Sequence, residues 1–197
     1  MHGPPIVLAS TSRYRRELLA RLRLDFTVAA PGVDEAALGG EPPAATAARL
    51  AVAKARAVLA THPGAVVIGS DQVAELDGRP LGKPLQHAAA LQQLVAMQGR
   101  TVVFHTALAV AGPADDALQL DCVPTSVTFR ELSLPALDAY LRADEPYDCA
   151  GAAKIESLGI ALVERVESED PTALVGLPLI RLTSMLAAAG IAVLAQG

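Results

Sequence analysis

The chain has 197 residues, of which 52% are apolar and 3% are aromatic, and its formal net charge is −5. The length suits a single domain over residues 1–197, which we expect to have two lobes, and the apolar content excludes extended disorder. The negative charge argues against non-specific binding to nucleic acid or to an anionic membrane, so neither is an expected partner.

The first part of the chain alternates short apolar runs with amphipathic stretches. The apolar runs predict strands at Ile6–Ala9, Phe26–Ala30 and Ala65–Gly69. The stretches between them predict helices at Arg13–Leu24 and Ala44–Ala60. Ser12 stands at the expected N-cap of the first helix, where its hydroxyl can accept a bond from a free backbone N–H group.

The middle of the chain contains a predicted hairpin turn at Asp77-Gly78 and a predicted helix at Gln86–Gln98, which Gly99 is expected to end. Two long strand-like runs follow, at Thr101–Ala111 and Leu118–Arg130. A Gly-Pro-Ala-Asp-Asp segment at residues 112–116 predicts the turn that joins them.

The last part of the chain begins with Ser133, the expected cap of a helix that runs to about Ala143. An irregular polar segment, a strand at Gly159–Val166 and a helix at Leu177–Ala189 follow. Because strands and helices alternate first and two adjacent strands come later, the order predicts an α/β fold with a mixed β-sheet.

Cysteine and histidine residues give no sign of a metal centre or a disulfide framework. Cys122 and Cys149 form no CxxC pair, and the four histidines show no metal-ligand spacing. No apolar run reaches membrane-spanning length, and the first ten residues lack the pattern of a signal peptide. We therefore expect a cytoplasmic protein without a membrane partner.

Three arginines crowd the start of the first predicted helix, directly after Ser10 and Ser12. A helix N-terminus carries free N–H groups and the positive end of the dipole, so each cation there costs about 0.3–1 kcal/mol if nothing compensates it. An anion bound among the arginines would turn this cost into a stabilising contribution. The segment therefore predicts a phosphate site; the alternative is a solvated basic helix start.

Ser70, Asp71 and Gln72 follow the predicted strand Ala65–Gly69. In open α/β sheets, functional sites gather at the carboxyl ends of strands. An aspartate there can hold Mg²⁺ or activate water. Asp71 is therefore a candidate catalytic residue, and the alternative is an ordinary turn residue.

The loop from Gly78 to Pro84 is close to a phosphate-binding P-loop but does not match it. A P-loop has four residues between its glycines and a Ser or Thr after the lysine, whereas this chain has three and Pro84. Because proline has neither a hydroxyl nor an N–H, we exclude a P-loop kinase or ATPase. Lys83 remains a candidate phosphate contact.

Two further segments have weak signals of their own. Lys154 and Glu156 lie in a loop before the predicted strand Gly159–Val166, where surface residues are common. Val175-Gly176-Leu177-Pro178 forms a turn into the last predicted helix, and its default interpretation is structural.

Taken together, the segments resemble the Maf family of nucleotide pyrophosphatases from about Ile6 to Gly190. The shared segments are Leu-Ala-Ser-Thr-Ser-x-Tyr-Arg-Arg, Val-Asp-Glu, Gly-Ser-Asp-Gln, Gly-Lys-Pro and Val-Gly-Leu-Pro-Leu. The residues around Tyr14, Gln72 and Glu156 look like the subfamily that hydrolyses 7-methyl-GTP. The resemblance implies release of 7-methyl-GMP and diphosphate from that nucleotide, and so a role in removing modified nucleotides.

The same resemblance implies a Maf or ITPase-like fold, in which a mixed twisted β-sheet flanked by helices forms two lobes with a central cleft. It also implies a divalent cation, Mg²⁺ or Mn²⁺, as cofactor. A cytoplasmic homodimer is the implied form of the protein.

Site residues also follow from the resemblance. Asp71 matches the family's proton acceptor, and Glu35 is the second catalytic candidate; both are candidate metal ligands. The residues that match positions of substrate choice are Tyr14, Gln72 and Glu156. The candidate substrate-binding residues of the cleft are Ser10, Arg15, Lys54, Lys83 and Lys154. Arg13 and Tyr14 depart from the family pattern, which has Pro and Trp there.

The chemistry of 7-methylguanine agrees with these residue types. Its ring is positively charged, and an aromatic face such as that of Tyr14 attracts a cation by roughly 0.5–2 kcal/mol. A carboxylate can accept hydrogen bonds from the base, each contributing about 1.5–3 kcal/mol. Burial of Tyr14 beside Leu18 is the rival interpretation of the tyrosine.

Two alternative functions remain. A related enzyme acting on dTTP and UTP would have arginine, threonine and glutamine at positions 14, 72 and 156, where this chain has Tyr, Gln and Glu. A non-catalytic nucleotide-binding regulator of cell division would use the same pocket without needing Asp71 or Glu35. The only lysines in the sequence, Lys54, Lys83 and Lys154, all fall in the predicted site.

Overall fold

The computed structural model describes residues 3–112 and 117–194, and these form two compact units. The first unit holds residues 3–72, 106–112, 117–123 and 170–194, and the second holds 73–105 and 124–169. Three long strands run through both units, because each crosses a boundary within its own length. Each unit is described below by itself.

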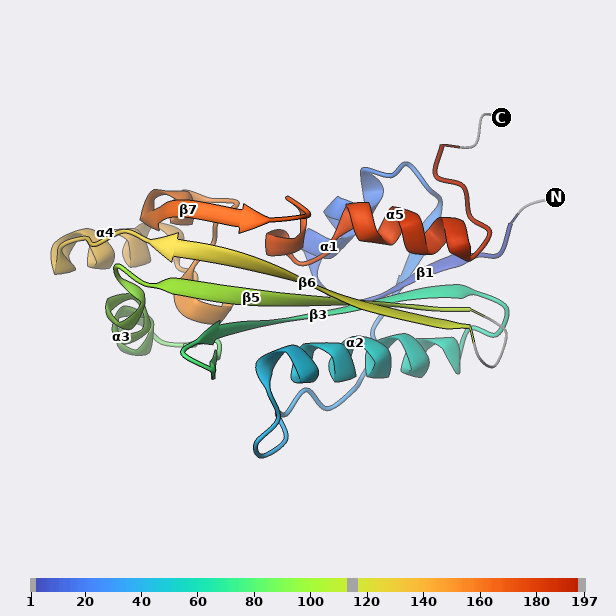
Figure 1. Cartoon of the computed structure of the whole chain (residues 1–197), viewed down its shortest axis with the longest axis horizontal. Coiled ribbons are helices and arrows are strands. Elements are labelled where there is room, and N and C mark those ends of the chain that lie inside the picture. The colour runs from blue at the N-terminus through green and yellow to red at the C-terminus, as the bar shows by residue number, and fades with distance from the viewer. Residues whose placement is uncertain (1–2, 113–116, 195–197) are drawn as a thin grey trace. The chain divides into compact units, whose positions relative to one another are not determined.

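The described residues form seven strands and five α-helices (Figure 1). The strands are β1 (Ile6–Ala9), β2 (Phe26–Ala29), β3 (Val66–Leu76), β4 (Arg79–Leu81), β5 (Thr101–Ala111), β6 (Leu118–Phe129) and β7 (Val163–Ser168). The α-helices are α1 (Arg13–Ala20), α2 (Pro43–Leu59), α3 (His87–Met97), α4 (Leu134–Asp144) and α5 (Leu179–Ala188). Three 3₁₀ turns are η1 (Ala150–Ala152), η2 (Leu158–Leu162) and η3 (Ala173–Val175).

The strands form one mixed sheet in the order β2-β1-β3-β5-β6-β7, with β4 paired to β3. β1 runs parallel to both β2 and β3, whereas β4 and β7 are antiparallel to their partners. The parallel ladder between β1 and β3 ends at the pair Ala9 and Gly69. The prediction of an α/β fold with a mixed sheet is confirmed.

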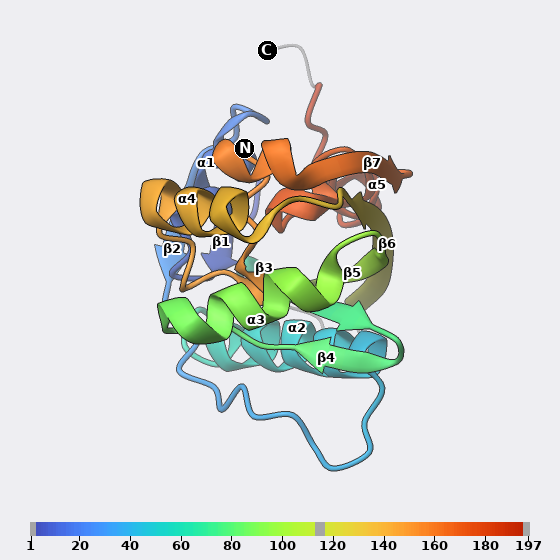
Figure 2. The ribbon, with the colours of Figure 1, turned by 90° about the vertical axis from the view of Figure 1, so that its left-hand side faces the viewer.

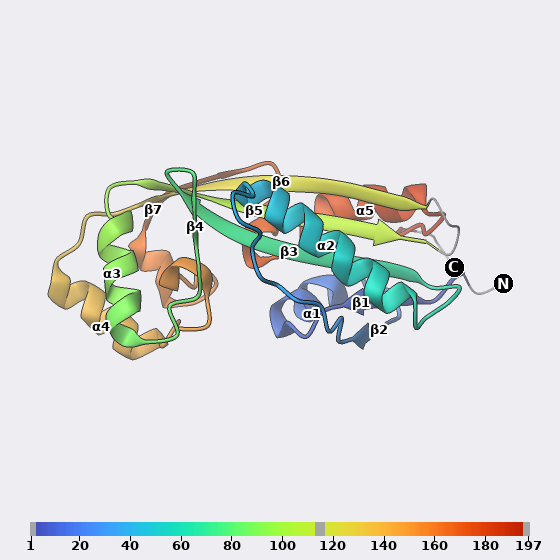
Figure 3. The ribbon, with the colours of Figure 1, turned by 90° about the horizontal axis from the view of Figure 1, so that it is seen from below.

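In the first unit, helices cover both faces of the sheet. Alternate residues of β1 and β3, such as Leu8 and Ile68, join Leu18 of α1 and Leu182 of α5 in one buried core. The opposite face of β3 meets α2, which runs along the strand in Figure 3. Burying each leucine contributes about 1.5–3 kcal/mol, so the two layers hold β3 firmly between them.

A glycine lets α2 approach β3 closely. A Cβ atom at Gly69 would stand 2.7 Å from the backbone nitrogen of Ala55 and overlap the backbone oxygen of Ala51. Any larger residue there would therefore push the helix away from the strand. The close approach brings the side chain of Lys54, which neighbours Ala55, towards the residues that follow Gly69.

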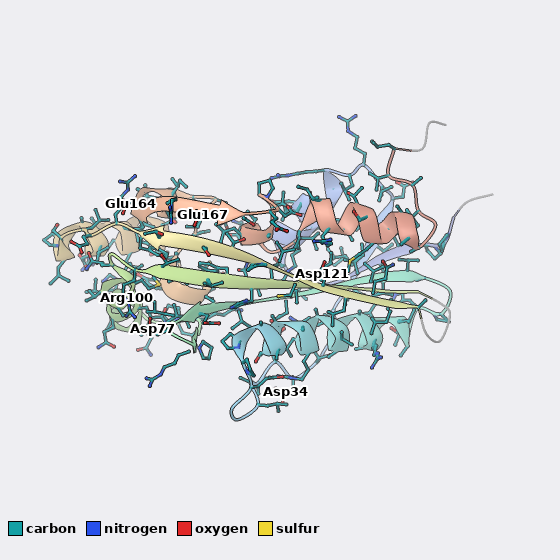
Figure 4. All side chains as sticks on the ribbon, in the orientation of Figure 1. Asp34, Asp77, Arg100, Asp121, Glu164 and Glu167 are labelled. Carbon is teal, nitrogen blue, oxygen red and sulfur yellow. The ribbon has the colours of Figure 1, made fainter. Side chains whose placement is uncertain are left out.

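The second unit consists of a hairpin, two packed helices and the outer halves of the long strands. Asp77 and Gly78 both have positive φ, 52° and 76°, which confirms the predicted hairpin turn and matches a type I′ geometry. Asp77 forms an ion pair with Arg100 beside this turn (Figure 4). α3 packs against α4, and both helices lie nearest the viewer in Figure 2.

The first major difference from the sequence prediction concerns β3, which does not end at Gly69. It continues to Leu76 because it loses β1 as a neighbour at Ala9 but gains β4, with Ala74 opposite Leu81. Asp71 therefore lies inside a strand and not just past its end. It still lies two residues beyond the parallel ladder.

A second difference concerns the predicted strand Gly159–Val166. Its first half forms η2, and β7 begins only at Val163. Gly159 donates a backbone hydrogen bond to the Lys154 oxygen, 3.1 Å away, and a Cβ there would be 2.7 Å from Lys154 backbone atoms. The chain is therefore folded back on itself at Gly159 and cannot be extended.

Smaller differences affect element ends. α1 ends at Ala20, four residues before the predicted end, and Ser133 occupies the N-cap of α4 without a side-chain cap bond. Residues 113–116 of the predicted turn at 112–116 lie outside the described residues. None of the helices in the described ranges is long and apolar enough to cross a membrane.

Candidate active site

Lys54 is the centre of a charged cluster in the first unit. Its Nζ lies 2.6 Å from Oδ1 of Asp71 and 2.5 Å from Oε1 of Glu35. The side chains of Lys54 and Asp71 are only 5% and 11% exposed, whereas Glu35 is 56% exposed. Breaking a buried pair of this kind by removing one charge costs about 3–5 kcal/mol, so the cluster holds its members in place.

The local fold explains why these residues meet. Gly69 and Asp71 are two positions apart in β3, so their side-chain positions share one face of the strand. That is the face against which α2 packs, and Lys54 belongs to α2. Glu35 comes from the segment between β2 and α2, which contains no helix or strand.

Arg15 is fixed by a backbone carbonyl far away in the sequence. Its Nε donates a hydrogen bond to the oxygen of Gly176, 2.8 Å away, and Ser70 Oγ donates to the same oxygen at 2.9 Å. Gly176 has φ of 115°, a backbone conformation that favours glycine. Burial lowers the pKa of Arg15, while the negative charges of Asp71 and Glu35 raise it. Arg15 therefore lies within electrostatic reach of both carboxylates.

The serines before α1 order the turn into that helix. Ser12 Oγ accepts a bond from the Arg15 backbone nitrogen at 3.4 Å, which confirms its predicted role as N-cap. Ser10 is buried, and its Oγ accepts a bond from the Ser12 nitrogen at 3.1 Å. The turn that precedes Arg15 is thus rigid before any ligand arrives.

Gln72 is anchored through its amide nitrogen. Nε2 lies 2.8 Å from Thr106 Oγ1, 3.1 Å from the Ala173 oxygen and 3.0 Å from the Leu174 oxygen. Because these hydrogen bonds hold Nε2 of Gln72, they fix the orientation of the side-chain amide. The amide oxygen, Oε1, therefore points away from Thr106, Ala173 and Leu174. The Oε1 atom of Gln72 is thus a hydrogen-bond acceptor of fixed orientation.

Tyr14 lies under the guanidinium of Arg13. The guanidinium carbon is 4.7 Å from the ring centroid, and Arg13 Nη2 donates to the Tyr14 hydroxyl at 3.1 Å. The ring is half-buried, and it is not part of the core cluster around Leu18. Tyr14 therefore holds a cation on its ring, as a stacking platform for a cationic base would.

The three remaining predicted residues belong to the second unit. Lys83, between β4 and α3, and Glu156, before η2, are both exposed. Lys154 is half-buried, and its backbone nitrogen donates to the hydroxyl of Tyr140 at 3.2 Å. The structure thus brings Arg15, Glu35, Lys54 and Asp71 together in the first unit, while the roles of Lys83, Lys154 and Glu156 stay predictions.

Sequence reasoning missed several residues that hold the site. Gly176 lay within a segment that was interpreted as a turn, and Ser70 stood beside the candidate Asp71 without a role of its own. Thr106 is a fully buried polar residue inside a strand, and its hydroxyl donates to the Ala173 oxygen at 2.9 Å. A threonine among apolar strand residues was the only available signal, and it is a weak one.

Asp170 was also missed, although it organises the segment that presents Gly176. It is 2% exposed, and its Oδ1 accepts bonds from the backbone nitrogen and the hydroxyl of Thr172 at 3.0 and 2.7 Å. Its Oδ2 accepts from the backbone nitrogens of Ile180 and Arg181 at the start of α5, at 2.7 and 3.4 Å. One carboxylate thus ties the loop of residues 170–178 to α5.

The acidic residues of the cluster fit a hard divalent cation. In the ranges 3–112 and 117–194, no group of three His, Cys, Asp or Glu side chains forms a metal site. Asp71 and Glu35 nevertheless converge on one cationic point, the Lys54 ammonium. Mg²⁺ is commonly bound by one or two carboxylates together with substrate phosphates, so this donor set suits a cation that enters with a triphosphate.

Comparison with known proteins gives a consistent family. Residues 5–189 match the family described as Maf-like protein. A 7-methyl-GTP pyrophosphatase of Albidiferax ferrireducens is 59% identical over 189 residues, which make up 96% of this chain and 95% of that protein. Enzymes of the same name from Cupriavidus metallidurans and Ralstonia nicotianae are 59% and 60% identical, covering 95% and 93% of this chain and 94% of each relative.

One solved structure shows a weaker likeness. The Staphylococcus aureus Ham1 protein overlaps 64% of this chain and 71% of its own, with 20% sequence identity and a TM-score of 0.45. That score is too low to carry an argument about this protein.

Proposed function

This chain belongs to the Maf family, and on that premise we propose that it is a 7-methyl-GTP pyrophosphatase. It hydrolyses the bond between the α- and β-phosphates of 7-methyl-GTP to give 7-methyl-GMP and diphosphate. The observation that carries the proposal is the pairing of relatives of that name, 59% identical over almost the whole chain, with a cluster of charges suited to a triphosphate.

Asp71 is the proton acceptor in this proposal. It is buried and held rigidly in β3, and Lys54 occupies only its Oδ1. The other oxygen is the one that takes a proton from the water attacking the α-phosphorus. A general base of this kind contributes typically 10²–10⁴-fold to the rate, according to general acid–base principles.

Lys54 and Arg15 neutralise the phosphates. The triphosphate oxygens compete with Asp71 and Glu35 for the Lys54 ammonium, so substrate binding loosens the ion pairs and leaves the carboxylates free to act. Arg15 is held through Nε by Gly176, which leaves its terminal nitrogens to contact phosphate. Fixed cations near the developing negative charge stabilise the transition state without reorganising.

We propose a divalent cation, Mg²⁺ or Mn²⁺, as cofactor, held by Asp71 and Glu35. When bound, such an ion neutralises charge on the phosphates and on the departing diphosphate. The support for this assignment is the convergence of the two carboxylates on a single cationic position.

Base recognition in the first unit is assigned to Tyr14 and Gln72, and Glu156 of the second unit keeps its predicted part in substrate choice. Tyr14 already stacks on a cation, the Arg13 guanidinium, and a 7-methylguanine ring would take a place of the same kind. The oriented oxygen of Gln72 accepts a hydrogen bond from the base. Tyr14 and Gln72 therefore favour a cationic purine.

The test is diphosphate release by the purified protein across a panel of 7-methyl-GTP, GTP, dTTP and UTP, with Mg²⁺ or Mn²⁺. We expect 7-methyl-GTP to have the highest kcat/KM. A preference for dTTP or UTP would contradict the substrate assignment, and tight binding of nucleotide without diphosphate release would contradict the enzymatic one. Omitting the metal with a chelator tests the cofactor assignment.

A further inference from the structure

Arg49 of α2 binds the carboxylate of Glu41 through two nitrogens of its guanidinium. Nε lies 2.8 Å from Oε1 of Glu41, and Nη2 lies 2.7 Å from Oε2. The contact is therefore bidentate, which fixes the relative orientation of the two side chains as well as their distance. Its partners are eight residues apart, one on the helix and one in the preceding segment.

The same pair ties down more of the segment between β2 and α2. Arg49 Nη2 also donates to the backbone oxygen of Ala36, 3.1 Å away. Glu41 Oε2 accepts bonds from Thr46 Oγ1 at 2.9 Å and from the Leu38 nitrogen at 3.5 Å. We call Glu41, Thr46 and Arg49 the loop clamp, because together they hold residues 36–41 against the first turns of α2.

The residue directly before the clamped backbone is Glu35. Its side chain is 56% exposed, yet it reaches the buried ammonium of Lys54 at 2.5 Å. Residues 30–42 contain no helix or strand, so no regular hydrogen bonding fixes this backbone. Ordering it costs about 1–2 kcal/mol of conformational entropy per residue unless other contacts compensate.

The charges of the clamp persist across the working pH range. The hydrogen bonds from Arg49 are the main reason that the pKa of Glu41 is lowered to about 2. Glu41 raises the pKa of Arg49, and the charges of Asp34 and Asp71 raise it further. The clamp is therefore an ion pair at every pH at which the enzyme would work, and it lies within electrostatic reach of the catalytic cluster.

We infer that Arg49 is a positioning residue: through Glu41 and the Ala36 carbonyl it holds the loop so that Glu35 meets Lys54 beside Asp71. This inference rests on the proposed function, since it assigns Glu35 to the hydrolysis of a nucleoside triphosphate. Arg49 itself does not contact the reacting atoms. Its effect on turnover passes through the place of the Glu35 carboxylate.

The first experiment compares the kinetics of Arg49→Ala, Arg49→Lys and Arg56→Ala on 7-methyl-GTP. Arg56 is the matched control, because it is an exposed arginine on the same helix and outside the clamp. We expect kcat to fall about 10-fold or more in Arg49→Ala with a smaller change in KM, since misplacing a catalytic group by about 1 Å can cost about 100-fold. Arg49→Lys keeps the charge but loses the fork, so it should rescue only part of the rate.

The second experiment places Arg49→Ala in a Glu35→Gln background. If Arg49 acts through Glu35, the double variant has the same kcat as Glu35→Gln alone. The inference is overturned if the two substitutions lower kcat independently, so that the double variant shows the product of the two single effects. It is also overturned if Arg49→Ala alone has the wild-type kcat. Should Arg49→Ala fold poorly, Glu41→Gln removes the other half of the ion pair and is subject to the same expectations.

A third measurement does not depend on activity. Hydrogen exchange of the backbone amides of residues 34–41 should be faster in Arg49→Ala than in the wild type, while exchange in α2 beyond Lys54 is unchanged. Unchanged exchange in the loop overturns the inference. If the wild type releases diphosphate from no nucleotide of the panel, the proposed function fails instead, and the exchange experiment still decides whether Arg49 orders the loop.

Discussion

The candidate residues of the two units differ in how they are held. In the first unit, Lys54 and Asp71 are buried partners, and Arg15 is bonded to a backbone carbonyl. In the second unit, Lys83 and Glu156 are exposed, and Lys154 is half-buried with its backbone nitrogen bonded to the Tyr140 hydroxyl. The first-unit residues are held by buried contacts before substrate binds, whereas the side chains of Lys83 and Glu156 lie in solvent.

This difference indicates a division of tasks. Transferring a proton and stabilising developing charge depend on distances held to fractions of an ångström, which buried and bonded groups provide. An exposed lysine on a loop can still attract a phosphate, but it loses side-chain entropy when it does so. We therefore expect substitutions in the first unit to affect chemistry and stability together, and substitutions in the second to affect turnover alone.

The largest effect is expected from Asp71→Asn. Asparagine keeps the shape and can still accept a bond from Lys54, but it cannot take up a proton, so kcat for 7-methyl-GTP should fall about 100-fold or more. Diphosphate release measures the effect, and thermal unfolding checks that the variant is folded. Asp25→Asn, an exposed aspartate of the same unit, is the control. Near wild-type turnover in Asp71→Asn would falsify the role of Asp71.

Asp170→Asn tests whether the buried hydrogen bonds of the first unit contribute to its stability. Asparagine has one acceptor oxygen, so it cannot accept hydrogen bonds both from Thr172 and from the backbone at the start of α5. We therefore expect the free energy of unfolding to fall by about 2–3 kcal/mol. Denaturant unfolding measures it. Asp121→Asn is the control: Asp121, labelled in Figure 4, pairs at the surface with Arg181 of α5, so its substitution should cost under about 1 kcal/mol. Equal effects of the two substitutions would contradict the bracing role of Asp170.

Lys83→Arg is the corresponding test in the second unit. If a compact ammonium is needed at this position, the larger planar guanidinium should lower kcat about 10-fold. The melting temperature should not change, because the side chain is exposed. Arg79→Lys, an exposed residue of β4, is the control for a basic exchange in this region. Unchanged turnover in Lys83→Arg would remove this lysine from the candidate site.

The smallest effect is expected from Glu41→Gln, and it depends on pH. The pKa of Glu41 is lowered from its ordinary 4.5 to about 2, so its charge stabilises the fold above the unfolded-state value and ceases to do so as the pH falls towards 2. The variant should melt below the wild type at pH 7, and the difference should vanish near pH 2.

The control for the pH series comes from the second unit. Glu167 pairs with Arg165, but both side chains are more than half exposed, so Glu167→Gln should leave the melting temperature unchanged at every pH. A pH-independent difference for Glu41→Gln, or equal effects of the two substitutions, would mean that the Glu41 ion pair does not stabilise the first unit.

Much of the local structure followed from residue patterns. The ranges of β1 and β5, the Asp77-Gly78 turn and the cap at Ser12 were predicted correctly. These features depend on residues close in sequence: a run of strand-forming apolar side chains, positive φ at a turn, and a hydroxyl near a free N–H. Predictions failed where pairing with another strand decided the conformation, as β4 does for the second half of β3.

The sequence likewise predicted which residues belong to the candidate site, but not how these residues are arranged. The motifs indicated which residue types belong to a nucleotide site, because carboxylates, lysines and arginines carry their chemistry wherever they stand. They could not indicate that Asp71 and Glu35 share Lys54, or that Arg15 bonds to a carbonyl 161 residues away. Those contacts exist because Gly69 admits α2 to the sheet and Asp170 ties the loop before α5, and both depend on the packing of the folded chain.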